Sequence, residues 1–406
     1  MRTSYFSISI WALQFGWRWP SGISRHVQPA YDSNMTDAPN DKLRTEPVAR
    51  RSPTLHDYPY ATERRKCFHK WIVNATPPGR FNCLHECLYC YAREAIYSRG
   101  KPGVLQYYQG LAVLVRREMS GLRLCPPLSI SNATDPCQPV AGLRKEVEGL
   151  VSLLASEGVS FGIVTKGDPS WLGEALTSPQ RGHACLAVSI EGPGDVLARL
   201  SPQAPGYELR VNAVQQMSRV LPTMVRLDPL FPHLLQALYG AGWMEIPAQM
   251  LREFAAAGAR HIISSTGRLD AKSRHTMSRV IASVSPEAAR RFDREYLYDR
   301  SYTSRGYMLE HGLRLELHRY LRSCAEAAGM TYATCQELDA WEADSEGLPH
   351  CEAFALPFCE RGIDGRWQPV PGCTANCHVN CARREDPPCG RPELATHLPY
   401  KRRYLV

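Results

Sequence analysis

Short apolar runs alternate with longer amphipathic stretches over most of the chain. Six runs have the length, the β-branched residues and the polar borders typical of β-strands; they span residues 69–75, 128–133, 161–166, 185–190, 223–228 and 261–266. Between them, apolar residues recur at helical spacing, as in residues 141–158, 232–240 and 248–258. The pattern therefore predicts a series of strand–helix units.

This repetition indicates an α/β fold. Nearly continuous apolar strands separated by helices are typical of a parallel sheet that helices cover. We expect a partial (β/α)6 TIM-like barrel rather than a Rossmann fold, because no GxGxxG sequence follows the first strand. In such barrels the functional side chains lie at the carboxyl ends of the strands.

The same pattern divides the chain into three parts. Residues 1–66 lack periodicity, so we expect a disordered or loosely attached segment, with translation starting at Met35. The mildly apolar stretch 5–15 lacks the cleavage pattern of a secretory signal. Residues 67–330 form the predicted barrel, and residues 331–406 form a Cys-rich, mostly irregular C-terminal extension.

Composition narrows the class of protein. The net charge of +8 is a mild excess that does not by itself indicate a polyanionic partner, and no run of about 18 apolar residues predicts a membrane-spanning helix. The 15 cysteines are bunched, with three in residues 83–90 and six in residues 351–389. Bunched cysteines in a chain with a large apolar core predict metal binding in a reducing compartment, the cytoplasm, rather than disulfides.

The first bunch follows the first predicted strand. Cys83, Cys87 and Cys90, here called the cysteine triad, have the spacing C-x3-C-x2-C. Three thiolates hold three irons of a 4Fe–4S cluster and leave the fourth iron open to another ligand. A structural zinc site requires a fourth ligand, and His85 lies too close to its neighbouring cysteines for the usual zinc spacing.

The triad, with Tyr89 before its last cysteine, resembles the radical SAM superfamily. LSISNATDPCQP (128–139), IVTKGD (163–168), LAVSIEG (186–192) and VRLDPLFP (225–232) are similar to the spore photoproduct lyase-like branch, over residues 67–335. The resemblance implies a 4Fe–4S cluster that binds and reductively cleaves S-adenosylmethionine (SAM). The resulting radical abstracts hydrogen from a substrate, in a lyase-like reaction of open outcome. A flavodoxin- or ferredoxin-type electron donor is expected.

Side chains near the triad and at strand ends are the candidates for holding SAM. They are Tyr89, Tyr91, Ser131, Asn132, Lys166, Ser189, Glu191 and Arg226. A buried ammonium needs an anionic partner, which the SAM carboxylate supplies for Lys166. The two tyrosines suit the adenine but are equally ordinary core aromatics. Arg226 suits a carboxylate but equally forms an ion pair with Asp228.

Cys137 is the candidate catalytic thiol. Spore photoproduct lyases return a hydrogen atom from a cysteine near this region, although the family position does not align cleanly with residue 137. The alternative is a buried small apolar side chain.

The C-terminal cysteines form a second candidate metal region. They are Cys335, Cys351, Cys359, Cys373, Cys377, Cys381 and Cys389. A segment with so many thiols and so little apolar core needs another group to hold its fold. Auxiliary iron–sulfur clusters and a structural zinc site are both open, and plain spore photoproduct lyases have no such tail.

Three functions follow from these features. The first is a radical SAM enzyme acting on nucleic acid or nucleotide, supported by interleaved Arg and Tyr in residues 290–307, although a solvated surface explains that stretch equally. The second is a radical SAM enzyme of biosynthesis or peptide modification. The third is a non-enzymatic zinc or iron–sulfur module.

Overall fold

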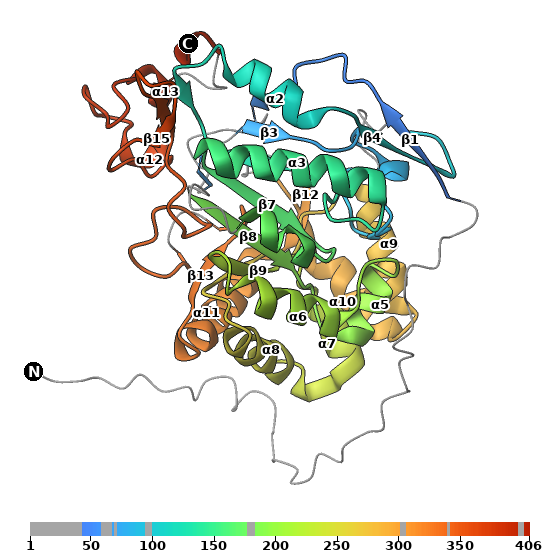
Figure 1. Ribbon diagram of the computed structural model, residues 1–406. Helices are drawn as coiled ribbons and strands as arrows, with labels where there is room; N and C mark the ends of the chain where they lie inside the picture. Colours follow the sequence, from blue (N-terminus) through green and yellow to red (C-terminus); the bar gives the residue numbers. More distant parts are fainter. Residues whose placement is uncertain are drawn as a thin grey trace, which may run out of the picture. The chain divides into compact units, whose positions relative to one another are not determined.

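A curved, mainly parallel sheet organises the protein. The computed structural model describes residues 43–57, 67–68, 71–93, 100–176, 183–300, 306–338, 342–396 and 402–406. The sheet has 8 strands in the order β13-β10-β9-β8-β7-β6-β3-β2 (Figure 1). In chain order these are β2 (His56–Asp57), β3 (Trp71–Val73), β6 (Leu128–Ile130), β7 (Phe161–Thr165), β8 (Ala184–Ser189), β9 (Thr223–Leu227), β10 (His261–Ser264) and β13 (Thr331–Thr334).

All pairings in this sheet are parallel except that of β2 with β3. The edge strands β2 and β13 do not pair with each other, so the sheet formed by the described residues is an open, partial barrel. The six predicted strands are confirmed as β3, β6, β7, β8, β9 and β10. Their nearly complete burial explains why the apolar runs are continuous rather than alternating.

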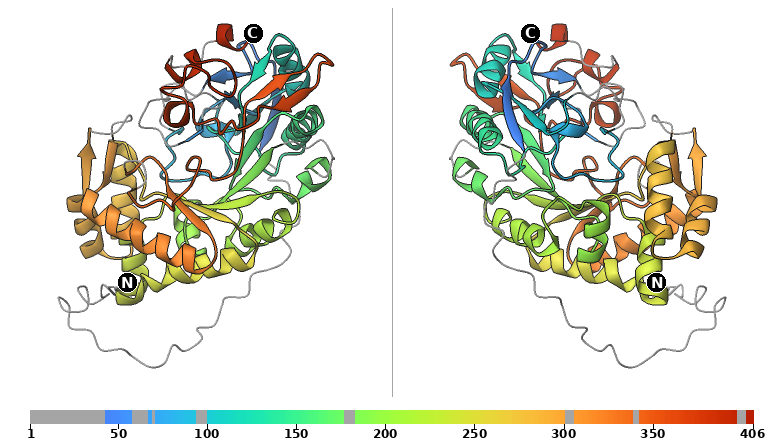
Figure 2. Two further views of the ribbon diagram at one scale, coloured as in Figure 1. Left: turned by 90° about the vertical axis from the view of Figure 1, so that its left-hand side faces the viewer. Right: turned by 90° about the vertical axis from the view of Figure 1, so that its right-hand side faces the viewer.

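Helices cover the outer side of the sheet (Figure 2). The helices are α2 (Leu111–Met119), α3 (Ala141–Glu157), α4 (Gly173–Leu176), α5 (Gly194–Leu200), α6 (Tyr207–Met217), α7 (Pro232–Tyr239), α8 (Glu245–Ala256), α9 (Ala271–Ala282), α10 (Pro286–Glu295), α11 (His311–Ala327), α12 (Cys377–Asn380) and α13 (Glu393–Thr396). In α3, Leu143, Val147, Leu150 and Leu154 are fully buried at helical spacing. The helix ends at Gly158, which has the left-handed conformation (φ 75°) common after helices. No helix in the described part of the chain is long and apolar enough to cross a membrane.

Smaller sheets accompany the main sheet. β1 (Arg44–Val48) pairs with β4 (Val104–Tyr108), and β11 (Tyr296–Asp299) forms a hairpin with β12 (Gly306–Leu309). β14 (Cys359–Arg361) pairs with both β15 (Trp367–Pro369) and β5 (Leu124–Cys125). The tail therefore contributes to a sheet whose third strand precedes β6.

The observed strands depart from the predicted segment boundaries at two places. β1 and β2 fall in residues 1–66, where backbone pairing with β4 and β3 orders residues that have no apolar pattern; residues 1–42 and 58–66 lie outside the described residues. β13 begins one residue after the expected boundary at 330 and belongs to the main sheet. Leu356 and Phe358 are fully buried in the same apolar core as the barrel.

Candidate active site

The cysteine triad lies in the loop that follows β3. Hydrogen bonds fix this loop to neighbouring segments: the Leu84 N–H donates to Oε1 of Gln138 over 2.7 Å. Burial raises the pKa of Cys83, and it raises the pKa of Cys87 to about 12. These thiols are therefore protonated on their own, and a bound metal would have to displace their protons.

Asp135 connects the triad loop to the end of β7. Its Oδ1 accepts hydrogen bonds from the Cys137 N–H (2.8 Å) and the Thr165 hydroxyl (2.7 Å). Its Oδ2 accepts the Lys166 N–H (2.6 Å) and lies 3.2 Å from Nε2 of His85. Burial alone would raise the pKa of Asp135, but His85 and these donors outweigh it and hold the pKa well below its usual range. Asp135 is thus an ionised carboxylate that organises the backbone around the cavity.

Glu191 is the centre of a second buried ionic network. Its carboxylate pairs with Nη1 of Arg210 (2.6 Å) and Nζ of Lys166 (3.2 Å), and it accepts a hydrogen bond from the Tyr89 hydroxyl. Burial alone would raise the pKa of Glu191, but the two cations lower it to about 2. Arg210 also donates to the Ser189 carbonyl over 2.9 Å. The network therefore fixes the end of β8, the triad loop and α6 relative to one another.

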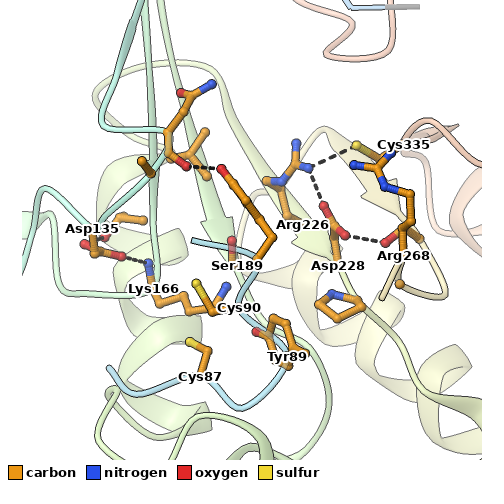
Figure 3. A pocket seen from close by; sticks show the side chains of 18 of the residues that line it. Cys87, Tyr89, Cys90, Asp135, Lys166, Ser189, Arg226, Asp228, Arg268 and Cys335 are labelled. Atoms are coloured by element: carbon orange, nitrogen blue, oxygen red, sulfur yellow. Dashed lines mark hydrogen bonds and ion pairs between the residues drawn. The ribbon is translucent and has the colours of Figure 1, made fainter. Parts of the chain in front are cut away.

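These elements border one cavity of about 320 Å³. Figure 3 shows Cys87, Cys90 and Lys166 on one side of it, here called the cofactor side. Arg226 and Cys335 lie on the opposite, distal side, together with Asp228 and Arg268. The carboxyl ends of the central strands thus bring the sulfur loop and several charged side chains to one hollow.

The predicted SAM-contacting residues, except Glu191, line this cavity. Glu191 is fully buried behind the wall, and its carboxylate contacts protein cations. Tyr91 is 55% exposed, and its hydroxyl donates to the Asn132 carbonyl over 2.6 Å. Ser131 has a positive φ of 55°, and its Oγ accepts the Ala75 N–H over 2.9 Å. The structure therefore brings the remaining candidates together, with Glu191 supporting Tyr89 and Lys166 from behind.

The distal side carries a group of thiols. Nη2 of Arg226 forms an ion pair with Asp228 and donates to Sγ of Cys335 over 3.3 Å. Cys67 also lines the cavity, and Sγ of Cys351 donates to its sulfur over 3.5 Å. Burial raises the pKa of Cys335 to about 11, although Arg226 opposes this shift. Cys67 and Cys335 line the cavity, whereas Cys351 contacts Cys67 without lining it.

Cys137 lies behind the cavity wall. It is only 4% exposed and is not among the residues that line the cavity. Its carbonyl is packed against Gly167, where an added Cβ would approach that oxygen to 2.1 Å. The donor role of Cys137 stays a prediction, because the structure does not bring its thiol to the cavity.

The structure divides the predicted C-terminal ligands into separate places. Cys335 lines the cavity with Cys67, Cys351 contacts Cys67 without lining the cavity, and Cys359 lies in β14 opposite Cys125 of β5. The remaining ones, Cys373, Cys377, Cys381 and Cys389, lie in or beside α12. Within the described ranges, no three His, Cys, Asp or Glu side chains converge as a preformed metal site, and this includes the triad.

Sequence reasoning missed several residues of the site. Arg210 is a fully buried cation on α6, and Arg268 follows β10 at the distal side. The sequence suggests His85 only as a possible zinc ligand, whereas in the structure it contacts Asp135. One feature of the sequence could have pointed to Cys67, which lies shortly before the first apolar strand.

Comparison with known proteins adds independent evidence. No protein-family model matches the chain. A curated radical SAM Nα-GlyT isomerase of Pseudomonas phage M6 is 21% identical over 359 residues, which cover 84% of this chain and 72% of that protein.

Two solved structures of spore photoproduct lyase are similar in fold. One is a double mutant with bound AdoMet and dinucleoside spore photoproduct, with 14% identity, a TM-score of 0.51, and coverage of 71% of this chain and 81% of that chain. The other is a single mutant, with 15% identity, a TM-score of 0.51, and coverage of 71% and 82%. The chain is therefore similar to a radical SAM enzyme in sequence and to spore photoproduct lyase in fold.

Proposed function

We propose that the cysteine triad binds a 4Fe–4S cluster, that SAM binds to the open iron, and that the enzyme abstracts hydrogen from a substrate held in the cavity. The observation that carries this proposal is that the triad, Lys166 and Ser189 all line a single cavity. Thiolates are the soft ligands that iron–sulfur clusters use. When bound, the cluster and SAM supply the radical chemistry.

Lys166 has donors to spare for the SAM carboxylate. An ammonium group has three N–H donors, and the contact with Glu191 uses one direction. The Tyr89 ring lies 5.6 Å from Nζ of Lys166, which places an aromatic face beside this charge. Ser189 completes this side with a hydroxyl at the end of β8. We propose that Lys166 and Ser189 bind SAM and that the Tyr89 ring packs between these two side chains.

For the substrate, we propose a nucleic acid or nucleotide. Leu269 lines the cavity and forms a β-bridge with Tyr307 of the β11–β12 hairpin. On this hairpin, Tyr298 is 49% exposed and lies 5.2 Å from Tyr307, ring centre to ring centre. The guanidinium of Arg274 lies 4.9 Å from the centre of the Tyr307 ring. Exposed aromatic rings beside arginines suit stacked bases and phosphates.

The second candidate function is the modification of a small molecule or peptide. The distal side favours this function, because Arg226 and Arg268 supply two cations inside the cavity. Two such cations suit a carboxylate of the substrate. For either substrate, Cys335 is better placed than Cys137 to return a hydrogen atom, because its thiol lines the cavity. We further propose that the C-terminal cysteines bind metal and that a flavodoxin- or ferredoxin-type protein supplies the electron.

The test is SAM cleavage by the anaerobically reconstituted protein. Dithionite and SAM are added, and 5′-deoxyadenosine is measured by mass spectrometry. The control carries Cys83→Ala, Cys87→Ala and Cys90→Ala together, and iron content is measured in both. We expect about four irons and nucleoside formation in the wild type alone.

Substrate class is tested by repeating the assay with duplex DNA, tRNA and cell extract. Nucleoside formation stimulated by nucleic acid, with binding that weakens as salt rises, supports the nucleic-acid proposal. Stimulation only by the small-molecule fraction of the extract supports the second candidate. Loaded protein that stays inactive under all these conditions would refute the proposed reaction.

A further inference from the structure

Two segments that are far apart in the sequence pack against each other beside the cavity. Sγ of Cys351 donates a hydrogen bond to Sγ of Cys67 over 3.5 Å. The neighbouring residues also touch, since the centres of the Phe68 and His350 rings lie 5.0 Å apart. Cys67 precedes β3, which lies next to one edge strand of the main sheet, and Cys351 follows β13, the other edge strand. The two thiols therefore join segments from the two sides of the open barrel.

The surroundings of the two thiols differ in their access to the cavity. The Cys351 carbonyl accepts a hydrogen bond from Nε2 of His261 over 2.9 Å, which fixes this cysteine at the start of β10. Ala333 and Leu348 pack around both cysteines in a small apolar group. Cys67 lines the cavity, whereas Cys351 is 2% exposed and lies behind it. A small reagent that enters the cavity therefore meets Cys67 first.

This geometry gives the two sulfurs different chemical roles. The hydrogen bond that Cys351 donates stabilises the thiolate of Cys67, and the thiolate is the nucleophilic form of cysteine. A disulfide bond is about 2 Å long, so an approach of about 1.5 Å from the present contact is sufficient to form one. An accessible thiol with a second thiol behind it is the arrangement in which a sulfenic acid condenses to a disulfide.

We propose that Cys67 and Cys351 are a redox-active dithiol that reduces hydrogen peroxide entering the cavity. The Cys67 thiolate attacks one peroxide oxygen, the O–O bond breaks, and the hydroxide that leaves takes up a proton to form water. Cys67 is then a sulfenic acid. The Cys351 thiol attacks its sulfur, the S–O bond breaks, and a second water leaves with the Cys351 proton. Two thiols and one peroxide thus give one disulfide and two water molecules.

This site goes beyond the proposed SAM reaction and does not depend on it. It assigns Cys351 to redox chemistry, apart from the other C-terminal cysteines that we propose to bind metal. An external thiol is sufficient to reduce the disulfide and restore both side chains.

A second pair of cysteines provides an internal comparison. Cys125 and Cys359 face each other in register between β5 and β14. Their sulfurs donate to carbonyl oxygens, Cys125 to Pro126 over 3.5 Å and Cys359 to Gly158 over 3.6 Å. Both cysteines are fully buried, and neither lines the cavity. We therefore expect this pair to stay reduced under conditions that oxidise the pair at the cavity.

Disulfide mapping of the full-length protein tests the proposal. The wild type and the triad variant, which lacks the competing thiols of the triad, are reduced and freed of oxygen, and an equimolar amount of hydrogen peroxide is added. The remaining thiols are alkylated, and the peptides are identified by mass spectrometry. We expect a disulfide between Cys67 and Cys351 in both proteins, alkylated Cys125 and Cys359, and full recovery of thiols with dithiothreitol.

Single substitutions test the roles of the two sulfurs. In Cys351→Ala, Cys67 should stop at the sulfenic acid, which dimedone labels, and in Cys67→Ala, Cys351 should stay a thiol. The matched control is Cys324→Ala on α11, which should form the disulfide as the wild type does. In the wild type, which needs no altered fold, Cys67 that remains a thiol while other cysteines oxidise would refute the proposal. Pairing of Cys67 with Cys335, or equally fast oxidation of Cys125 and Cys359, would refute it as well.

Discussion

Replacing Glu191 with Gln tests whether the buried ionic network stabilises the barrel. The substitution keeps the shape of the side chain and its ability to accept hydrogen bonds, but it removes the negative charge between Arg210 and Lys166. Both cations would then lack their shared anion inside the protein. We expect a large loss of stability, because breaking a buried ion pair from one side costs about 3–5 kcal/mol.

The pKa of Glu191 gives a second route to this magnitude. It falls from an ordinary 4.5 to about 2, and each pKa unit is worth about 1.4 kcal/mol, so the charge contributes about 3 kcal/mol. Because the folded pKa is the lower one, this contribution is fully present above the ordinary value and is lost as the pH falls toward 2. The wild type should therefore lose more stability on acidification than Glu191→Gln does.

Urea unfolding of the cluster-free protein at pH 7 and pH 4 measures both effects. Glu208→Gln is the matched control, since Glu208 is an exposed carboxylate on α6, the helix that carries Arg210. We expect that control to stay within about 0.5 kcal/mol of the wild type. The network's role would be contradicted if Glu191→Gln lowered the free energy of unfolding by less than about 1 kcal/mol at pH 7. It would also be contradicted if the difference in this free energy between the wild type and Glu191→Gln did not shrink at pH 4.

Four further substitutions test the proposed roles of residues in and near the cavity. Lys166→Met should weaken SAM binding by about tenfold to a hundredfold, as loss of a charged hydrogen bond does, at unchanged iron content; equilibrium binding of SAM measures this. Cys335→Ala should reduce product formed per 5′-deoxyadenosine, whereas Cys137→Ala should leave that ratio unchanged; the opposite pattern would return the donor role to Cys137. Arg274→Ala should lower the slope of log binding constant against log salt for single-stranded DNA by about one. An unchanged slope would show that Arg274, beside the hairpin, does not contact a phosphate.

The barrel could be predicted from the sequence because its strands are buried on both faces. A strand such as β8, with every residue buried, leaves an apolar run that needs no knowledge of its neighbours. Some of the strands that escaped prediction, such as β1 and β14, are partly exposed and so leave no continuous apolar run. Their residues are strands because a distant segment pairs with them, and no local pattern records that pairing.

The site was predictable where function imposes a local spacing and unpredictable where charges meet across the fold. The triad is contiguous, and Lys166 and Ser189 end apolar strands, so both features are visible in the sequence. Arg210 lies on a helix beside exposed residues and looks like a surface cation until Glu191 is seen against it. Sequence alone thus assigned Glu191 to SAM, although its charge is neutralised inside the protein.

The two sides of the cavity are held by different parts of the fold, and this division has a consequence for the chemistry. On the cofactor side, Asp135 and Glu191 fix the triad loop and the ends of β7 and β8 through hydrogen bonds and ion pairs within the protein. On the distal side, Arg226 is held by Asp228 and Cys335, which follow β9 and β13. Changes to the distal residues can therefore leave undisturbed the groups that we propose to hold the cluster and SAM. Under the proposed function, we accordingly expect the reaction outcome to depend on the distal side and radical initiation to depend on the cofactor side.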